Sequence, residues 1–182
     1  METKMITKII YYLIFPFCFC IVFPGCKSNQ IDNEKERKEI NTMLDSWNTA
    51  AAKADFNAYF NYLSDDAVFI GTDATENWDK KSYMIWAKPF FDKGKAWDFK
   101  SIERHIYFDK SGKTAWFDEL LNTQMKICRG SGVLIKSNST WKIQQYVLSM
   151  TIPNNKTDTV ISLKASTEDA IINKLLKELS NK

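Results

Sequence analysis

The sequence contains a single histidine, His105, and this scarcity limits the chemistry open to the chain. A zinc site built on histidines is excluded, because such sites draw on several of them. The sequence also lacks a phosphate-binding loop, a dinucleotide fingerprint and a paired-cysteine metal site. We therefore expect no metal ion and no cofactor.

Cysteine is also scarce where it could form disulfides. Of four cysteines, Cys18 and Cys20 lie in an N-terminal apolar run and Cys26 follows it directly. Only Cys128 belongs to the remaining chain. We expect no disulfide, and Cys128 should behave as a small buried hydrophobe.

The first 25 residues have the pattern of a secretory signal. Lys4 and Lys8 flank the start of the apolar run Ile9 to Phe23, and Gly25 precedes Cys26. The run is shorter than the roughly twenty residues of a membrane-spanning helix, and Pro16 interrupts it. The alternative of a retained anchor helix is therefore less favoured than a signal peptide over residues 1–25.

Gly25-Cys26 at the end of this run resembles a bacterial lipobox. The resemblance implies cleavage before Cys26 and lipidation of its thiol. Residues 26–32 then form a polar tether. The expected location is outside the cytoplasm, in the periplasm or at the cell surface, with the chain anchored to a membrane through lipid.

Charge argues against a nucleic-acid partner. The formal net charge is +3, and removal of Lys4, Lys8 and Glu2 with the signal lowers it to +2. No basic run with interleaved aromatic residues appears in the sequence.

The N-terminal half of the remaining chain has helical periodicity. The pattern predicts helices over Asp32 to Ala54, over a short segment capped by Asp55, and from Asp79 to Phe91. An apolar β segment over Ala67 to Gly71 and a polar loop from Thr72 to Asn77 separate the second helix from the third.

From Trp97 onward the period changes to two, which is typical of strands. Strands are expected around Ile102 to Phe108 and over Thr114–Asn122, Ile127–Lys136 and Trp141–Ile152. Pro153 to Lys164 should be irregular, and a final amphipathic helix should begin at Ser166. This order predicts an α+β domain over residues 33–153 and a C-terminal extension over residues 154–182.

Four segments resemble the SnoaL-like domain family of the nuclear-transport-factor-two-like superfamily. They are Phe69–Asp73, Ala115–Leu120, Cys128–Leu134 and Trp141–Tyr146. The resemblance implies a cone in which three N-terminal helices pack on a curved, mainly antiparallel sheet around a pocket. Because the superfamily includes isomerases, dehydratases, hydrolases, cyclases and assembly domains, the fold leaves function open.

Strand pairing inferred from the loops selects the residues that face this pocket. A loop over Thr123–Met125 places Glu119 opposite Arg129, and the other loops place Arg104 beside Phe117 and Gln145 beside Ser131. The inner face is then mostly apolar, with four polar exceptions. The apolar set is Ile102, Ile106, Phe117, Leu121, Val133, Ile143 and Val147, and the polar set is Arg104, Glu119, Arg129 and Gln145.

Two arginines that share one glutamate leave a surplus positive charge, and guanidinium groups match carboxylates well. The hypothesis is an apolar pocket, lined in part by Tyr59, Trp86 and Trp97, with one end that binds an anionic or polar group. The alternative for the Glu119–Arg129 pair is a structural ion pair.

The opposite face should carry His105, Tyr107, Trp116, Asp118, Leu120, Tyr146 and Leu148. Such an apolar face predicts a contact surface, and we expect a homodimer through it. With the only histidine outside, a Ser-His-Asp triad in the cavity is excluded.

Two functions remain open. The first is a non-catalytic lipoprotein that binds a small apolar ligand or mediates assembly. The second is a small isomerase, dehydratase or hydrolase in which Glu119 or Asp73 is the acid or base and Arg104 or Arg129 holds an oxyanion.

Overall fold

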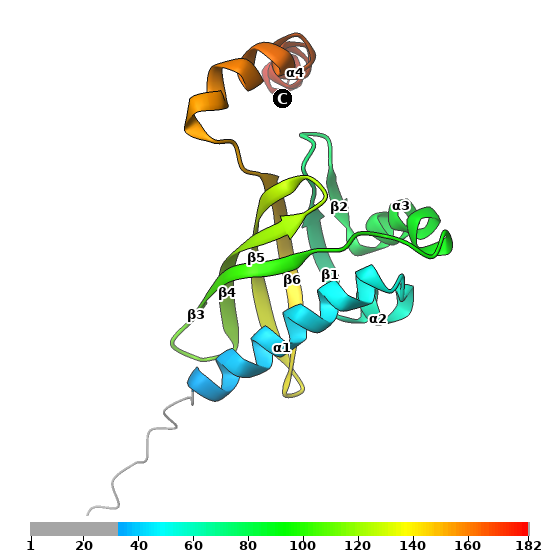
Figure 1. Cartoon of the computed structure of the whole chain (residues 1–182), viewed down its shortest axis with the longest axis vertical. Coiled ribbons are helices and arrows are strands. Elements are labelled where there is room, and N and C mark those ends of the chain that lie inside the picture. The colour runs from blue at the N-terminus through cyan, green and yellow to red at the C-terminus, as the bar shows by residue number, and fades with distance from the viewer. Residues whose placement is uncertain (1–32, 182) are drawn as a thin grey trace, which may run out of the picture. The chain divides into compact units, whose positions relative to one another are not determined.

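The computed structural model describes residues 33–181, so the expected signal peptide, lipidation of Cys26 and tether lie outside the described residues. The elements follow in the order α1 (Asn33–Ala52), α2 (Phe56–Asn61), β1 (Leu63–Ile70), β2 (Asn77–Asp79), α3 (Lys80–Asp92), β3 (Lys100–Phe108), β4 (Thr114–Thr123), β5 (Lys126–Ser137), β6 (Thr140–Met150), the 3-10 turn η1 (Asn154–Lys156) and α4 (Thr157–Ser180) (Figure 1). The described residues belong to one unit of the chain. The buried apolar core lies between Ile40 and Leu148, so we expect residues 27–182 to fold alone.

Helix α1 buries one stripe against the sheet. Ile40, Leu44, Trp47 and Ala51 recur every three or four residues and are all buried. They pack against β3 and β6. The predicted amphipathic helix is therefore confirmed, with bounds that differ from the expected ones by one residue at its start and two at its end.

A partly buried ion pair fixes the first turn of α1. The Glu36 carboxylate accepts hydrogen bonds from Lys136 Nζ at 2.5 Å and from Trp141 Nε1 at 2.7 Å. The hydrogen bond and charge of Lys136, together with the bond from Trp141, lower the pKa of Glu36, and burial opposes them. Because Lys136 and Trp141 lie on β5 and β6, this contact sets where α1 crosses the sheet.

The other two N-terminal helices start at capping aspartates. Asp55 accepts a hydrogen bond from the Ala58 amide, and Asp79 accepts one from the Ser82 amide. Helix α3 continues through Pro89 to Asp92, and Gly94 follows with a left-handed φ of 71°. The predicted cap at Asp55 is confirmed.

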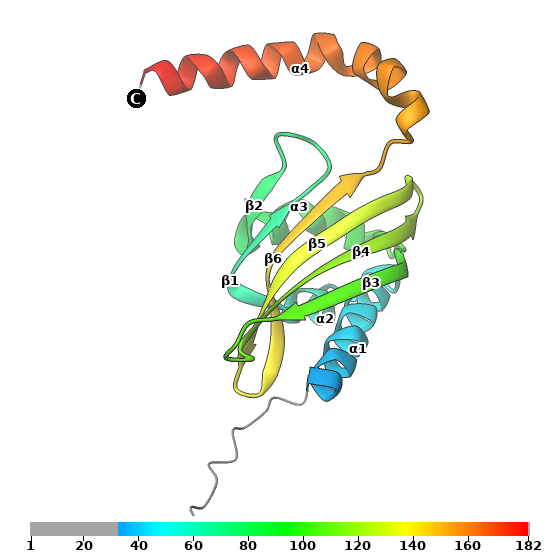
Figure 2. The ribbon, with the colours of Figure 1, turned by 90° about the vertical axis from the view of Figure 1, so that its left-hand side faces the viewer.

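The six strands form one curved sheet in the order β2-β1-β6-β5-β4-β3. Only β1 and β6 run parallel, and the other neighbours are antiparallel. Helices α1, α2 and α3 lie on the same face of this sheet, as Figure 2 shows from the opposite side. The expected α+β class is confirmed.

The pairing of β4 with β5 differs from the expected register by one residue. The connection is a two-residue turn, because Thr123 pairs with Lys126 across Gln124 and Met125. The Thr123 hydroxyl stabilises this turn by accepting from the Met125 amide and donating to the Lys126 carbonyl. Glu119 therefore stands opposite Gly130 instead of Arg129. A shift by one residue moves a whole strand to the other face.

The predicted register of β5 and β6 was also wrong. Gln145 was expected beside Ser131, but it pairs with Val133. Asn138 and Ser139 form a two-residue turn with φ of 49° and 63°, and Lys136 pairs with Trp141. A register shift next to Leu134 follows, so that the β6 side chains beyond Ile143 change faces.

The corrected registers change the two faces of the sheet. Ile106, Phe117, Leu121 and Ile143 are buried on the inner face as expected. The buried set also includes Tyr146 and Leu148, which were expected outside. The residues expected inside but found on the outer face or exposed are Ile102, Val133 and Val147.

Three boundaries differ from the sequence prediction. Strand β1 begins at Leu63 instead of Ala67, and the short strand β2 lies in and beyond a segment expected to be a loop. Helix α4 begins at Thr157, nine residues before Ser166, and no residue of α4 is buried. Cys128 is buried and free, as expected.

Candidate functional site

A buried ion pair joins β3 to β4 inside the domain. The expected pairing of Arg104 with Phe117 was wrong by two residues, because Ile106 stands opposite Phe117 and Arg104 stands opposite Glu119. The Nε and Nη2 atoms of Arg104 lie 2.9 and 2.8 Å from Glu119 Oε2. Glu119 is 1% exposed, and the side chain of Arg104 is 5% exposed. At this depth each charge needs the other, because a single buried charge costs several kcal/mol.

The second carboxylate oxygen of Glu119 is also engaged. Its Oε1 accepts a hydrogen bond from the Tyr146 hydroxyl at 3.2 Å. Gly130 makes room for this contact, since a Cβ there would lie 2.3 Å from the Tyr146 hydroxyl oxygen. Burial raises the pKa of Glu119, and the charge and hydrogen bonds of Arg104 and Tyr146 act in the opposite direction.

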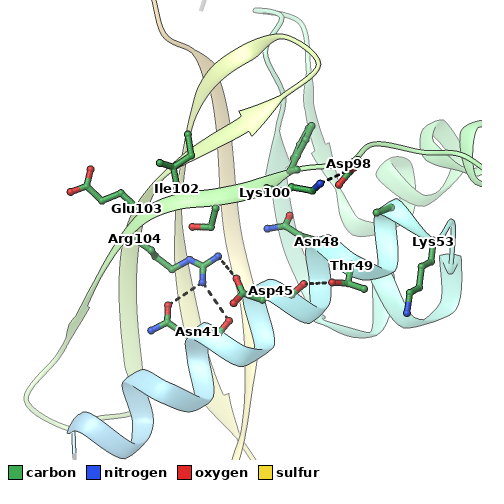
Figure 3. Close-up of a pocket in the computed structure, with 13 residues that line it drawn as sticks. Asn41, Asp45, Asn48, Thr49, Lys53, Asp98, Lys100, Ile102, Glu103 and Arg104 are labelled. Carbon is green, nitrogen blue, oxygen red and sulfur yellow. Dashed lines mark hydrogen bonds and ion pairs between the residues drawn. The ribbon is translucent and has the colours of Figure 1, made fainter.

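Helix α1 completes the coordination of Arg104. Nη1 donates to Asn41 Oδ1 at 3.0 Å and to the Asn41 carbonyl at 3.4 Å, and Nη2 lies 3.0 Å from Asp45 Oδ1 (Figure 3). The guanidinium thus bridges two strands and a helix. We call the buried Arg104, Glu119 and Tyr146, together with the half-buried Asn41 and the exposed Asp45 at their edge, the buried polar cluster.

A polar groove of about 600 Å³ runs beside this cluster, between α1 and the segment 98–104. Figure 3 shows its walls, with Asn41, Asp45, Asn48 and Thr49 on the helix side and Asp98, Lys100 and Arg104 opposite. Arg104 lines it but already holds three partners, and Lys100 lies 3.9 Å from Asp98. The groove therefore has no unpaired guanidinium with which to form the expected anion site.

Three other candidates from the sequence lie away from any cavity described here. Arg129 is exposed on the outer face, and Gln145 pairs with the outward-facing Val133. Asp73 is an exposed turn residue whose carboxylate accepts from the Thr75 hydroxyl at 2.6 Å and from the Thr75 amide at 2.9 Å. The two bonds from Thr75 lower the pKa of Asp73. The expectation that Arg129 and Gln145 face the pocket was wrong, because both registers that carried it were displaced.

A second cavity of about 310 Å³ lies beside α3, the hairpin of β1 and β2 and the β4–β5 turn, and it shares Phe99 with the lining of the polar groove. We call it the aromatic pocket. Trp86 and Trp97 line it, and Tyr59, the third aromatic residue expected in a pocket wall, lies behind it with its hydroxyl 2.9 Å from that of Tyr83. Its rings come from Phe69, Trp78, Tyr83, Trp86, Phe90, Trp97 and Phe99.

The rings stack around Tyr83, which is buried at the base of this pocket. Phe69 lies 4.0 Å from Tyr83 between ring centroids with an interplanar angle of 14°, and Trp78 lies 5.7 Å away at 17°. Trp86 and Trp97 follow at 6.0 and 6.3 Å, tilted by 22° and 23°. The pocket walls thus present ring faces in roughly parallel planes.

Few polar side chains line the pocket. They are Thr72, Glu76 and Gln124. The sequence pattern missed Trp78, because β2 is only three residues long and so short a strand has no readable period. It also missed Glu76, which lies in the turn before β2, a segment expected to be a plain polar loop. Among residues 33–181, no three His, Cys, Asp or Glu side chains gather to hold a metal ion.

Comparison with known proteins gives one family. A family model described as SnoaL-like domain matches residues 40–153. The matched range includes the buried polar cluster and both cavities. The search of curated proteins gave no match.

Solved structures share the fold at low identity. An NTF2-like protein of unknown function from Pseudomonas putida KT2440 matches with a TM-score of 0.57 at 13% identity, over 66% of this chain and 90% of the other. A candidate dehydratase of the NTF2-like family from Streptomyces avermitilis matches at 0.58 and 10%, over 66% and 99%. A candidate aromatic ring hydroxylase from Novosphingobium aromaticivorans matches at 0.57 and 14%, over 66% and 92%.

Replacement of Arg104 by methionine tests whether the buried polar cluster stabilises the domain. Arg104→Met leaves the Glu119 carboxylate buried without its cation, so we expect the free energy of unfolding to fall by about 3 kcal/mol. Urea unfolding of residues 27–182 at neutral pH measures this change. Arg129→Met is the matched control, because Arg129 is exposed, and it should change stability by less than about 0.5 kcal/mol. Equal losses in the two variants would contradict a stabilising role for the cluster.

Proposed function

The chain belongs to the SnoaL-like domain family, and from this premise we propose that its domain binds a small, mostly apolar ligand in the aromatic pocket without converting it. The observation that carries the proposal is the pocket itself. Its volume of about 310 Å³ lies at the lower end of the range of small-molecule sites. Trp86 and Phe90 keep 39% and 41% of their surface exposed at its rim, where a ligand would cover them.

The geometry favours binding over catalysis. Glu119 lines neither of the two cavities and has both oxygens engaged within the domain. Asp73 holds its own turn and also lies outside the pocket lining. Neither carboxylate named as an acid or base is therefore positioned to meet a ligand among the aromatic rings. The isomerase, dehydratase or hydrolase alternative loses the residues on which it rested.

The ligand's polar end would meet the side chains that line the same pocket. Thr72, Glu76 and Gln124 offer one hydroxyl, one carboxylate and one amide. The two arginines expected to bind an anionic end lie elsewhere, one in the buried polar cluster and one on the outer face. This arrangement supports a polar end and argues against a carboxylate.

Thermal unfolding of residues 27–182 with a panel of small aromatic compounds tests this function. A compound at about a hundred times its dissociation constant adds roughly 2.7 kcal/mol, which raises the melting temperature by about 5 °C or more for a domain of this size. We expect Trp86→Ala to abolish the shift. Leu163→Ala is the control, because Leu163 is 78% exposed on α4 and does not line the pocket. A shift that survives in Trp86→Ala, or no shift with any compound, would remove the proposal.

We also propose that the chain is a lipid-anchored protein of the cell envelope, with residues 1–25 removed and Cys26 lipidated. The motif at Gly25-Cys26 supports this, and none of the described helices is long and apolar enough to cross a membrane. Cys26→Ser should release the protein from the membrane fraction of an expressing bacterium. Retention of that variant in the membrane fraction would contradict lipid anchoring.

A homodimer through the outer face is the third part of the proposal. Tyr107 and Trp116 stack there at 6.0 Å between ring centroids, and both are nearly half exposed. Light scattering on residues 27–182 should give twice the monomer mass, and Trp116→Lys should give the monomer mass. A monomer for the unaltered domain at micromolar concentration would exclude this dimer.

A further inference from the structure

One charged side chain lines the aromatic pocket, and it is negative. Glu76 belongs to the lining, whereas no lysine, arginine or histidine does. Within residues 33–181, no lysine or arginine forms an ion pair with Glu76. The pocket therefore combines apolar walls with a carboxylate that has no counterion of its own.

The backbone holds this carboxylate in place. The Gly71 amide donates to the Glu76 carbonyl at 3.0 Å, and the Glu76 amide donates to the Asp73 carbonyl at 3.0 Å. The side chain folds over Gly71 and accepts from the Asp73 amide at 3.2 Å. A Cβ at position 71 would lie 2.1 Å from Glu76 Oε2, so glycine there leaves the space that the carboxylate occupies.

The charge of Glu76 reaches the base of the pocket. Burial raises the pKa of Tyr83 well above its ordinary value, and the neighbouring tyrosines and Glu76 add to the rise. Glu76 and the rings of Tyr83, Trp86 and Trp97 line the same cavity.

Ring faces attract cations, because the π-electrons give each face a partial negative charge. In the described part of the chain, the protein's own cation–π contacts are Arg37 over Phe108, Lys88 over Phe56 and Lys136 over Trp141. All three rings lie outside the pocket lining. Trp78 and Trp86 pack on each other at 4.7 Å between ring centroids, and the 39% of Trp86 that stays exposed is the tryptophan surface that a ligand can reach.

We propose that the aromatic pocket binds a small organic cation, an ammonium group that carries apolar substituents. The ammonium charge lies between the tryptophan faces and Glu76, and the apolar substituents fill the rest of the pocket. The inference rests on the proposed function, since it names the class of ligand for that same pocket. An anion is disfavoured because Glu76 repels it and no basic residue lines the cavity. A neutral ligand would partly desolvate the carboxylate and leave it only the hydrogen bond from the Asp73 amide.

Matched probes test the charge of the ligand directly. Choline and 3,3-dimethylbutan-1-ol have the same shape but differ in whether nitrogen or carbon bears the three methyl groups. Benzyltrimethylammonium and phenylacetate add an aromatic cation and an aromatic anion. Titration calorimetry with residues 27–182 measures the affinity of each probe, and quenching of tryptophan fluorescence reports contact with the pocket. We expect choline to bind about tenfold tighter than its carbon analogue, and benzyltrimethylammonium to bind better than phenylacetate.

Glu76→Gln should weaken binding of both cations by about tenfold and leave the neutral probe unchanged. Glutamine can still accept from the Asp73 amide, so the turn is preserved. Glu103→Gln makes the same chemical change at an exposed position outside the pocket and serves as the control for net charge. We expect this control to bind the cations as the unaltered domain does.

The outcomes separate the two proposals. If the neutral probe or the anion binds as tightly as the cations and Glu76→Gln has no effect, the cation assignment is wrong. If that binding is still lost in Trp86→Ala, the pocket remains the ligand site. If none of the four probes binds the unaltered domain, both the cation assignment and the aromatic pocket as a binding site are overturned.

Discussion

The buried ion pair between Arg104 and Glu119 is the contact on which the interior of this domain depends. It joins β3 to β4, reaches β6 through the Tyr146 hydroxyl and reaches α1 through Asn41 and Asp45. A carboxylate that is 1% exposed cannot stay ionised without such partners. Because the partners come from three strands and one helix, the ion pair constrains their relative positions more tightly than apolar packing alone. The glycine at position 130 is part of the same constraint, since any larger residue would occupy the space of the tyrosine hydroxyl.

This constraint also divides the interior into two regions. In one region Arg104 forms ion pairs with Glu119 and Asp45. In the neighbouring region, rings stack around Tyr83 and a single carboxylate, Glu76, lines a cavity. Charges that pair with each other stabilise a fold, whereas a carboxylate with no ion pair among the described residues, beside the partly exposed Trp86, has interactions left to offer a ligand. The aromatic pocket is therefore the proposed binding site, because Arg104 and Glu119 already pair with each other elsewhere in the domain.

The family relationship is consistent with this division of roles. Proteins that share the fold at 10 to 14% identity carry names as different as dehydratase and aromatic ring hydroxylase. At such identity the shared feature is the curved sheet with helices on one face. This fold can enclose a cavity, but it does not determine which residues line the cavity or which ligand it binds. Function in this chain must then be argued from the residues that line the aromatic pocket, and these include Glu76 and Trp78 on the short hairpin of β1 and β2.

The sequence by itself determined the α+β class, the order of the elements apart from β2, the helix cap at Asp55 and the buried free Cys128. These features depend on local periodicity and on capping chemistry, which neighbouring residues carry. Only the tertiary structure decided which residue faces Glu119. Two turns proved one residue shorter than the loops assumed, and a register shift in β6 turned Tyr146 inward and Gln145 outward. Side chains alternate between faces at every residue of a strand, so a register error of one residue placed Arg129 opposite Glu119 where the structure has Gly130. The predicted register of β3 was displaced by two residues, and an even displacement keeps Arg104 on the inner face.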